Sequence, residues 1–155
     1  MRATYYFDSS ALVKRYVTEV GTEWVRSLVT PAGGNLSLTS CVTTIEVRSA
    51  LARRRRDGAI LQDEHTFALE ALRVHSLSQY RLVELDASVA SLAGDLLERY
   101  PLRAYDAVQL ASVLIIARAL TGTGLTAPIF LTADDRLLDV ARAEGLPADN
   151  PNWHP

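Results

Sequence analysis

The sequence predicts an α/β fold, in which a central, mostly parallel sheet of four to five short strands is flanked by helices. Short β-prone segments alternate along the chain with longer helical ones, which is the pattern of a parallel sheet covered by helices. Apolar residues make up 48% of the 155 residues and are spread along the whole chain, enough for a buried core without disulfides. Because no repeat or linker interrupts this pattern, we expect one domain over residues 1–155.

Four segments have the composition of strands. The first is short and aromatic and stops at a polar run that begins with Asp8, which is typical of a buried strand followed by a helix cap. The second alternates apolar and polar residues, as a strand with one buried face does. The strands are expected at residues 4–7, 36–39, 81–85 and 128–131.

The helical segments lie between these strands and after them. Residues 42–56 and 61–79 are separated by Asp57 and Gly58, so we expect them to form a helical hairpin. Residues 105–120 are apolar nearly all round, which predicts a buried helix. The remaining helices are expected at residues 11–17, 21–28, 89–100 and 137–144.

Composition sets limits on location and partners. The formal net charge is −2, which is not typical of nucleic-acid binders, although net charge does not say where the charges lie. The one cysteine, Cys41, rules out a disulfide within the chain and is compatible with a reducing compartment. We see neither a signal peptide nor the roughly 20 uninterrupted apolar residues of a membrane span. We therefore expect a cytoplasmic protein with no membrane contact.

Four acidic residues stand out by their positions. Asp8 and Asp134 follow the first and last predicted strands, and ligands of parallel α/β folds bind at this end of the strands. Glu46 and Asp106 lie near the beginnings of otherwise apolar helices, where an unpaired carboxylate is costly. The chain has a single lysine, Lys14, so a divalent cation with oxygen ligands is a suitable partner for these acids.

Each acid also has a structural explanation. Asp8 and Asp134 can be helix N-caps, and Asp106 suits the first turn of a helix whatever its function. Glu46 can pair with Arg48 or another arginine. From the residues alone, an acidic site is indicated and its chemistry stays open.

Four motifs resemble those of PIN-domain proteins, especially the VapC-type toxins of bacterial toxin–antitoxin pairs. They occur in the family's order, at family-like spacing, and span nearly the whole chain. The matching segments are residues 5–16, 43–47, 102–111 and 130–134, followed by 143–146 and 150–151.

The resemblance implies the PIN fold and an endoribonuclease that depends on Mg²⁺ or Mn²⁺. Carried over position by position, its catalytic acids are Asp8, Glu46, Asp106 and Asp134, with Asp8 and Asp106 binding the main ion directly. Glu46 and Asp134 would act through waters or help to hold a second ion. Asp135 leaves open which carboxylate of that pair faces the pocket.

Candidate RNA contacts are Lys14, Arg15, Arg103 and Thr132, which lie close in sequence to the acids. The densest basic run, residues 53–56, ends a predicted helix. Cations favour helix C-termini and charge runs usually coat solvated faces, so we favour that interpretation over RNA contact.

The resemblance also implies partners, namely an RNA substrate, a cognate antitoxin that blocks the site, and a second copy of the chain. The predicted hairpin has apolar surface to spare, which could form a homodimer or pack on the sheet. A phosphoacceptor signalling domain is disfavoured, since it needs a late lysine and Lys14 is the only one. A non-catalytic PIN-type scaffold that binds RNA or protein, and a nuclease acting on DNA, remain alternatives.

Overall fold

A parallel five-stranded sheet forms the centre of the protein. We describe it from a computed structural model, in which residues 2–155 are described. The strand order is β3-β2-β1-β4-β5, and every neighbouring pair is parallel. The strands are β1 (Thr4–Phe7), β2 (Leu36–Ser40), β3 (Tyr80–Val83), β4 (Ile129–Leu131) and β5 (Ala148–Asp149).

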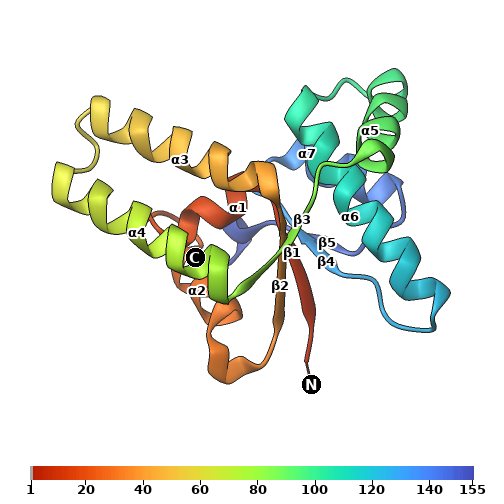
Figure 1. Cartoon of the computed structure of the whole chain (residues 1–155), viewed down its shortest axis with the longest axis horizontal. Coiled ribbons are helices and arrows are strands. Elements are labelled where there is room, and N and C mark those ends of the chain that lie inside the picture. The colour runs from red at the N-terminus through yellow and green to blue at the C-terminus, as the bar shows by residue number, and fades with distance from the viewer. Residues whose placement is uncertain (1) are drawn as a thin grey trace.

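Seven α-helices within the described residues cover the two faces of this sheet, with α1 to α4 on one side and α5 to α7 on the other (Figure 1). Short 3-10 turns follow α1 and α2 and end the chain, at Val13–Arg15, Pro31–Gly33 and Pro151–Trp153. The helices are α1 (Ser9–Leu12), α2 (Thr22–Val29), α3 (Cys41–Arg56), α4 (Gln62–Ser78), α5 (Ala87–Arg99), α6 (Ala104–Gly122) and α7 (Asp135–Ala143).

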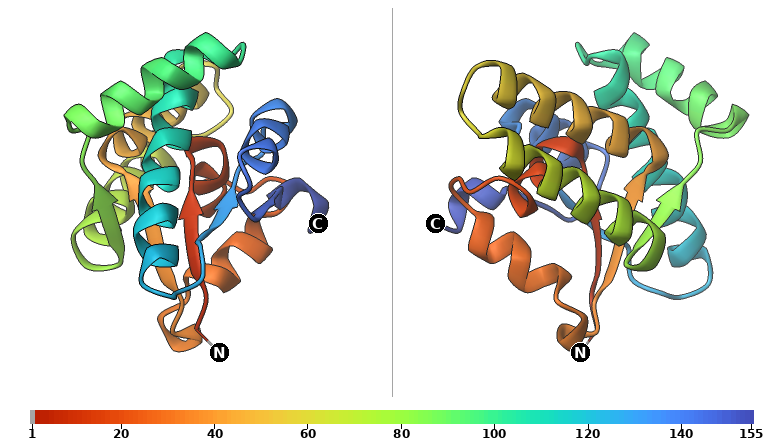
Figure 2. Two further views of the ribbon diagram at one scale, coloured as in Figure 1. Left: turned by 90° about the vertical axis from the view of Figure 1, so that its right-hand side faces the viewer. Right: turned by 60° about the vertical axis from the view of Figure 1, so that its left-hand side comes forward.

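The strand order reverses at β1. From β1 the chain adds β2 and then β3 on one side, whereas β4 and β5 are added on the other. The pairing of β1 with β4 sets Phe7 opposite Leu131, so that the residues after both strands emerge side by side. In parallel α/β sheets such a reversal leaves a crevice at the carboxyl ends of the strands. The end of β1 and the turn after β4 lie at this point (Figure 2). Asp8 directly follows β1.

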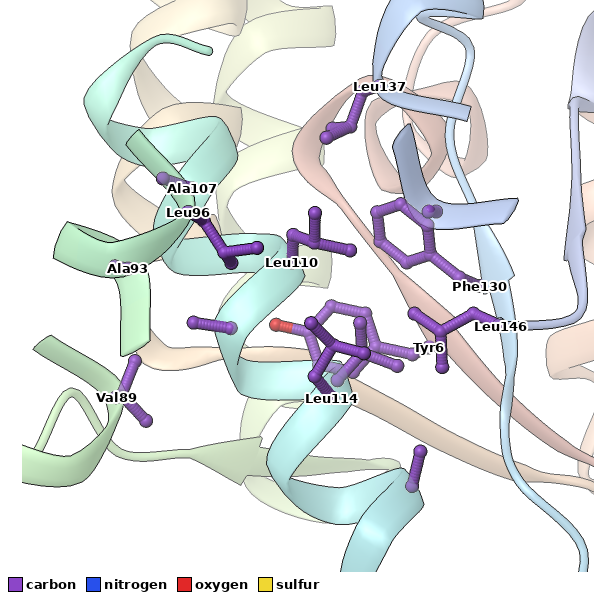
Figure 3. Close-up of a cluster of buried hydrophobic side chains, with 14 of the residues drawn as sticks. Tyr6, Val89, Ala93, Leu96, Ala107, Leu110, Leu114, Phe130, Leu137 and Leu146 are labelled. Atoms are coloured by element: carbon purple, nitrogen blue, oxygen red, sulfur yellow. The ribbon is translucent and has the colours of Figure 1, made fainter. Parts of the chain in front are cut away.

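Two apolar cores fill the space on either side of the sheet. Alternation along β1 sends Tyr6 to one core and Phe7 to the other, and both side chains are fully buried. Tyr6 packs with Phe130 and with leucines of α5, α6 and α7, as Figure 3 shows. Phe7 packs with residues of α1 to α4. The sheet is therefore anchored on both faces, and its carboxyl edge is held in place.

The predicted fold class is confirmed, and so are the four strands and the helical hairpin, now α3 and α4. Strand β5 is not among the predicted segments, because two residues are too few to show an alternating pattern. The apolar residues of α4 are divided between the core and the surface, in keeping with the apolar surface expected on the hairpin. Phe67 is 78% exposed and Leu77 is 77% exposed.

Helix α6 is the one described helix that is long and apolar enough to span a membrane by length and composition. It packs against α5 and the sheet, and its residues contribute much of the core around Tyr6. Its apolar character is therefore accounted for by its position in the protein core.

A close backbone contact joins the beginning of α2 to the end of the chain. Gly21 has φ of +85°, and a Cβ there would overlap the carbonyl oxygen of Pro151. Gly58 also has a positive φ, of +75°, but nothing surrounds it.

We expect Gly21→Ala to lower the free energy of unfolding by clearly more than the matched substitution Gly58→Ala does. Both substitutions force alanine into the left-handed region, at about 1–2 kcal/mol. Only the Gly21 change adds overlap with a backbone, which costs roughly another 1–3 kcal/mol. Urea unfolding of the two variants measures the difference, and equal losses would contradict this account of the contact.

Candidate active site

A cleft of about 590 Å³ opens at the carboxyl edge of the sheet. All four acids selected from the sequence line it, although they come from four separate parts of the chain. Four basic side chains line it as well. The charged lining residues are Asp8, Lys14, Glu19, Glu46, Arg53, Arg54, Arg103, Asp106 and Asp134.

Asp8 caps α1 and also faces the cleft. Its Oδ1 accepts a hydrogen bond from the backbone N–H of Ala11 at 2.9 Å and from the Ser10 hydroxyl at 2.7 Å. Both bonds go to one oxygen, so the other takes no part in the cap. The two interpretations of Asp8 from sequence are therefore compatible, and the side chain is only 3% exposed.

Hydroxyl groups hold the ends of β1 and β4 together. Ser10 Oγ accepts from the backbone N–H of Ala133 at 2.8 Å and lies 3.3 Å from Thr132 Oγ1. Thr132 Oγ1 in turn accepts from the backbone N–H of Asp134 at 3.1 Å. Thr132 is fully buried and does not line the cleft, so its position gives no support to the predicted contact with RNA. Its hydroxyl is taken up in positioning the turn.

Glu46, in the second turn of α3, is fixed from two sides. Ser9 Oγ donates to its Oε2 at 3.1 Å, and Gln109 Nε2 donates to its Oε1 at 2.9 Å. Gln109 also donates to Thr43 Oγ1 at 2.7 Å and accepts from the Tyr6 hydroxyl at 3.0 Å. A buried polar network thus runs from the core to a carboxylate in the cleft.

The remaining acids enter the cleft from helix N-termini. Asp106 lies in the first turn of α6, one turn before Gln109. Asp134 caps α7, and its Oδ1 accepts from the backbone N–H groups of Arg136 and Leu137. The neighbouring Asp135 lies outside the cleft and accepts from Asn150 at 2.7 Å. Of this pair, Asp134 is the residue that faces the site.

Burial, together with the charges of neighbouring acids, raises the pKa of three of these carboxyl groups. Burial is the main cause that raises the pKa of Asp8 to about 7, and the charge of Asp106 adds to it. Burial also raises the pKa of Glu46 and of Asp106, and the latter is raised further by Asp134. Removing water from these carboxylates therefore costs free energy that no salt bridge offsets, because none within residues 2–155 involves Asp8, Glu46 or Asp106.

This donor set suits a hydrated divalent cation. Every candidate ligand is a carboxylate, which is the oxygen donor that Mg²⁺ prefers, and bound positive charge would offset the repulsion among the acids. No group of three or more His, Cys, Asp or Glu side chains within the described chain is close enough together to hold a metal ion. Mg²⁺ is usually held by one or two carboxylates and keeps several waters, so an open arrangement is compatible with it.

The candidate RNA contacts separate in the structure. Arg103 lines the cleft and is exposed. Lys14 lines it too, but its ammonium group donates to Glu19 at 3.2 Å and to the Val20 carbonyl at 2.8 Å. Arg15 points away from the cleft and donates to Tyr80 and Gln79, each at 2.6 Å. The contacts of Arg15, which lies in the 3-10 turn after α1, therefore give no support to the predicted contact with RNA.

Sequence reasoning missed residues that support or surround the acids. Gln109 was detectable, since a glutamine one turn after Asp106 in an apolar helix needs buried partners. Arg53 and Arg54 lie seven and eight residues after Glu46, which is two helical turns along the same face. From sequence, both arginines are expected in a solvated basic run.

We expect Gln109→Met to lower the free energy of unfolding by about 1–3 kcal/mol, because it leaves buried partners without hydrogen bonds. Gln62→Met, on the exposed first turn of α4, should change it by less than about 0.5 kcal/mol. Urea unfolding measures both variants. Equal stability of the two would show that the buried network contributes nothing to the fold.

Comparison with known proteins agrees with this geometry. The PIN domain family model matches residues 5–143. Ribonuclease VapC45 and Ribonuclease VapC49, both from Mycobacterium tuberculosis, are each 38% identical to this chain over 111 residues, which is 72% of this chain and 75% of each relative.

Solved structures show the same fold at low identity. A toxin–antitoxin complex from Klebsiella pneumoniae has a chain with a TM-score of 0.61 and 16% identity, over 95% of this chain and 97% of that one. VapBC-5 from Mycobacterium tuberculosis gives a TM-score of 0.56 and 16% identity, over 96% of this chain and 97% of that one. The family match, the VapC relatives and the parallel sheet agree that this chain belongs to the PIN-domain family, among its VapC proteins.

Proposed function

We propose that this protein is an endoribonuclease that hydrolyses RNA phosphodiester bonds with Mg²⁺ or Mn²⁺, as the toxin of a toxin–antitoxin pair. The observation that carries the proposal is the meeting of four acids, from β1, α3, α6 and the turn after β4, in one cleft. The two relatives with 38% identity are ribonucleases by name, which supports the same activity.

Asp8 and Asp106 would hold the metal ion, since each is a partly or fully buried carboxylate with no cation paired to it among residues 2–155. When bound, the ion supplies a Lewis acid that offsets charge building on the phosphate oxygens and makes water a better nucleophile. Asp134 is the fourth acid that lines the cleft, and its hydrogen bonds to backbone N–H groups of α7 fix its orientation.

Glu46 is suited to accept a proton from the attacking water. Its pKa is raised by burial, so it holds a proton more readily than an exposed glutamate does. Ser9 and Gln109 orient its two oxygens. The water oxygen bonds to phosphorus while the bond from phosphorus to the 3′-oxygen breaks, and a proton is delivered to that oxygen. The products carry a 5′-phosphate and a 3′-hydroxyl.

Two protein partners belong to the proposal. Proteins with the same fold have been solved as toxin–antitoxin complexes, and an antitoxin that covers the cleft would block it. A second copy of the chain would cover apolar side chains that the α3–α4 hairpin leaves exposed, among them Leu61, Phe67 and Leu77. We place the protein in the cytoplasm, where a chain with one cysteine needs no oxidising conditions.

Purified protein should cut RNA with Mg²⁺ or Mn²⁺ and should not cut it in EDTA. Asp106→Asn should lower the cleavage rate at least 100-fold, because it removes a charge from the centre of the cleft. Asp95→Asn, on the exposed face of α5, is the matched control and should leave the rate unchanged. Gel analysis of labelled RNA, beside DNA of the same sequence, measures each rate.

Cutting that survives both EDTA and Asp106→Asn would sink the metal-dependent mechanism. RNA binding without cutting, in the presence of either metal, would favour the non-catalytic scaffold. Faster cutting of DNA than of RNA would contradict the proposed RNA substrate and would favour a nuclease that acts on DNA.

The buried acid predicts a pH-dependent stability of the metal-free protein. Ionised Asp8 is disfavoured in the fold, so the penalty grows as the pH rises from about 4 and is complete above its pKa of about 7. Asp8→Asn keeps the oxygen that caps α1 and removes this penalty. In EDTA at pH 8 it should raise the Tm by several degrees, at roughly 2–4 °C per kcal/mol, and the gain should shrink toward pH 4.

Asp86→Asn is the control for capping. Asp86 caps α5 through the backbone N–H of Val89 at 2.9 Å but is exposed and outside the cleft, so its Tm should not rise. Mg²⁺ should stabilise the wild type more than Asp8→Asn. A Tm for Asp8→Asn below that of the wild type at pH 8 in EDTA would contradict the electrostatic account.

A further inference from the structure

We propose that Arg53 and Arg54, near the end of α3, form a phosphate-binding subsite for RNA at a distance from the bond that is cut. The inference rests on the proposed function and names how that site holds its substrate. The cleft extends along one face of α3, from Glu46 through Ser49 and Ala50 to the two arginines. Figure 1 shows α3 leaving the edge of the sheet and running outward to the turn that joins it to α4.

The spacing along α3 sets how far this subsite lies from the acids. With a rise of about 1.5 Å per residue, the arginines lie about 10–12 Å along the helix from Glu46. Successive phosphates of one strand in a stacked helix advance by about 3.4 Å, and those of an extended strand by more. The arginines therefore meet a phosphate about two to three nucleotides from the scissile one.

Both guanidinium groups can reach a phosphate. Arg53 is exposed, and its side chain makes no hydrogen bond or ion pair with any residue in the described range 2–155. Arg54 donates to Glu19 at 3.1 Å, but Glu19 is shared with Lys14. Two cations thus share one carboxylate, which leaves net positive charge at this end of the cleft. Guanidinium is the side chain best matched to phosphate oxygens.

The preference of helix C-termini for cations explains why a basic run ends α3. It does not explain why only two of its four arginines line the cleft. Arg55 donates to Gln62 of α4, and neither Arg55 nor Arg56 lines the cleft. The four arginines therefore form two pairs on the same helix turn. Arg53 and Arg54 face the cleft, whereas Arg55 and Arg56 do not, and the two pairs carry the same charge. This division gives the experiment a matched control.

The experiment compares Arg53→Gln/Arg54→Gln with Arg55→Gln/Arg56→Gln. Fluorescence anisotropy with a labelled ten-nucleotide RNA in EDTA measures affinity without cleavage. We expect the first pair to weaken binding about tenfold or more and to reduce the slope of log K against log[salt] by about 0.7, the value for one phosphate contact with a single strand. The second pair should change both quantities little.

Substrate length separates a distant subsite from damage to the acids. With metal, Arg53→Gln/Arg54→Gln should lower kcat/KM for the ten-nucleotide RNA and leave it unchanged for a dinucleotide, which is too short to reach the arginines. Because Arg54 also pairs with Glu19, Arg53→Gln alone is tested beside the pair. It breaks no hydrogen bond or ion pair among residues 2–155, and it should show the same length dependence.

Equal losses for the two pairs, or equal losses for long and short RNA, would overturn the subsite while leaving the nuclease intact. A wild-type protein that cuts no RNA with either metal would instead overturn the proposed function, and the subsite with it.

Discussion

The parallel pairing of β1 with β4 is the constraint on which the site depends. Asp8 donates its backbone N–H to the carbonyl of Leu131 at 3.1 Å, joining two segments separated by most of the chain. This bond and the Ser10 and Thr132 hydroxyls set the distance between the first acid and the turn that carries Asp134. The two cores then hold α3 and α6 against opposite faces, so that Glu46 and Asp106 reach the same edge from either side.

The protein keeps this site at an electrostatic cost. Carboxylates that are withdrawn from water and set near one another favour protons or cations over the free ionised state. The fold tolerates the cost because cap bonds, hydroxyls and the Gln109 amide satisfy the individual oxygens. The same arrangement explains how a chain with a net charge of −2 can approach a polyanion, since four of its basic residues line the cleft with the acids.

The positions of the acids could be predicted from the sequence, whereas the directions of the basic side chains could not. Asp8 and Asp134 follow strands, and parallel strands end at one edge, so their meeting follows from topology. The directions of the basic side chains do not follow from local pattern. Lys14 and Arg15 are neighbours, yet one lines the cleft and the other packs against Tyr80. Which arginines of residues 53–56 face the cleft depends on how α3 is rotated against the sheet, which tertiary packing decides.

The order of the acids along the chain has a consequence for biosynthesis. Asp8 is synthesised long before β4 and Asp134. The nascent protein can fold the α3–α4 hairpin before the strand that closes the cleft has been made. The cleft therefore cannot assemble around all four acids until β4 and the turn after it have left the ribosome.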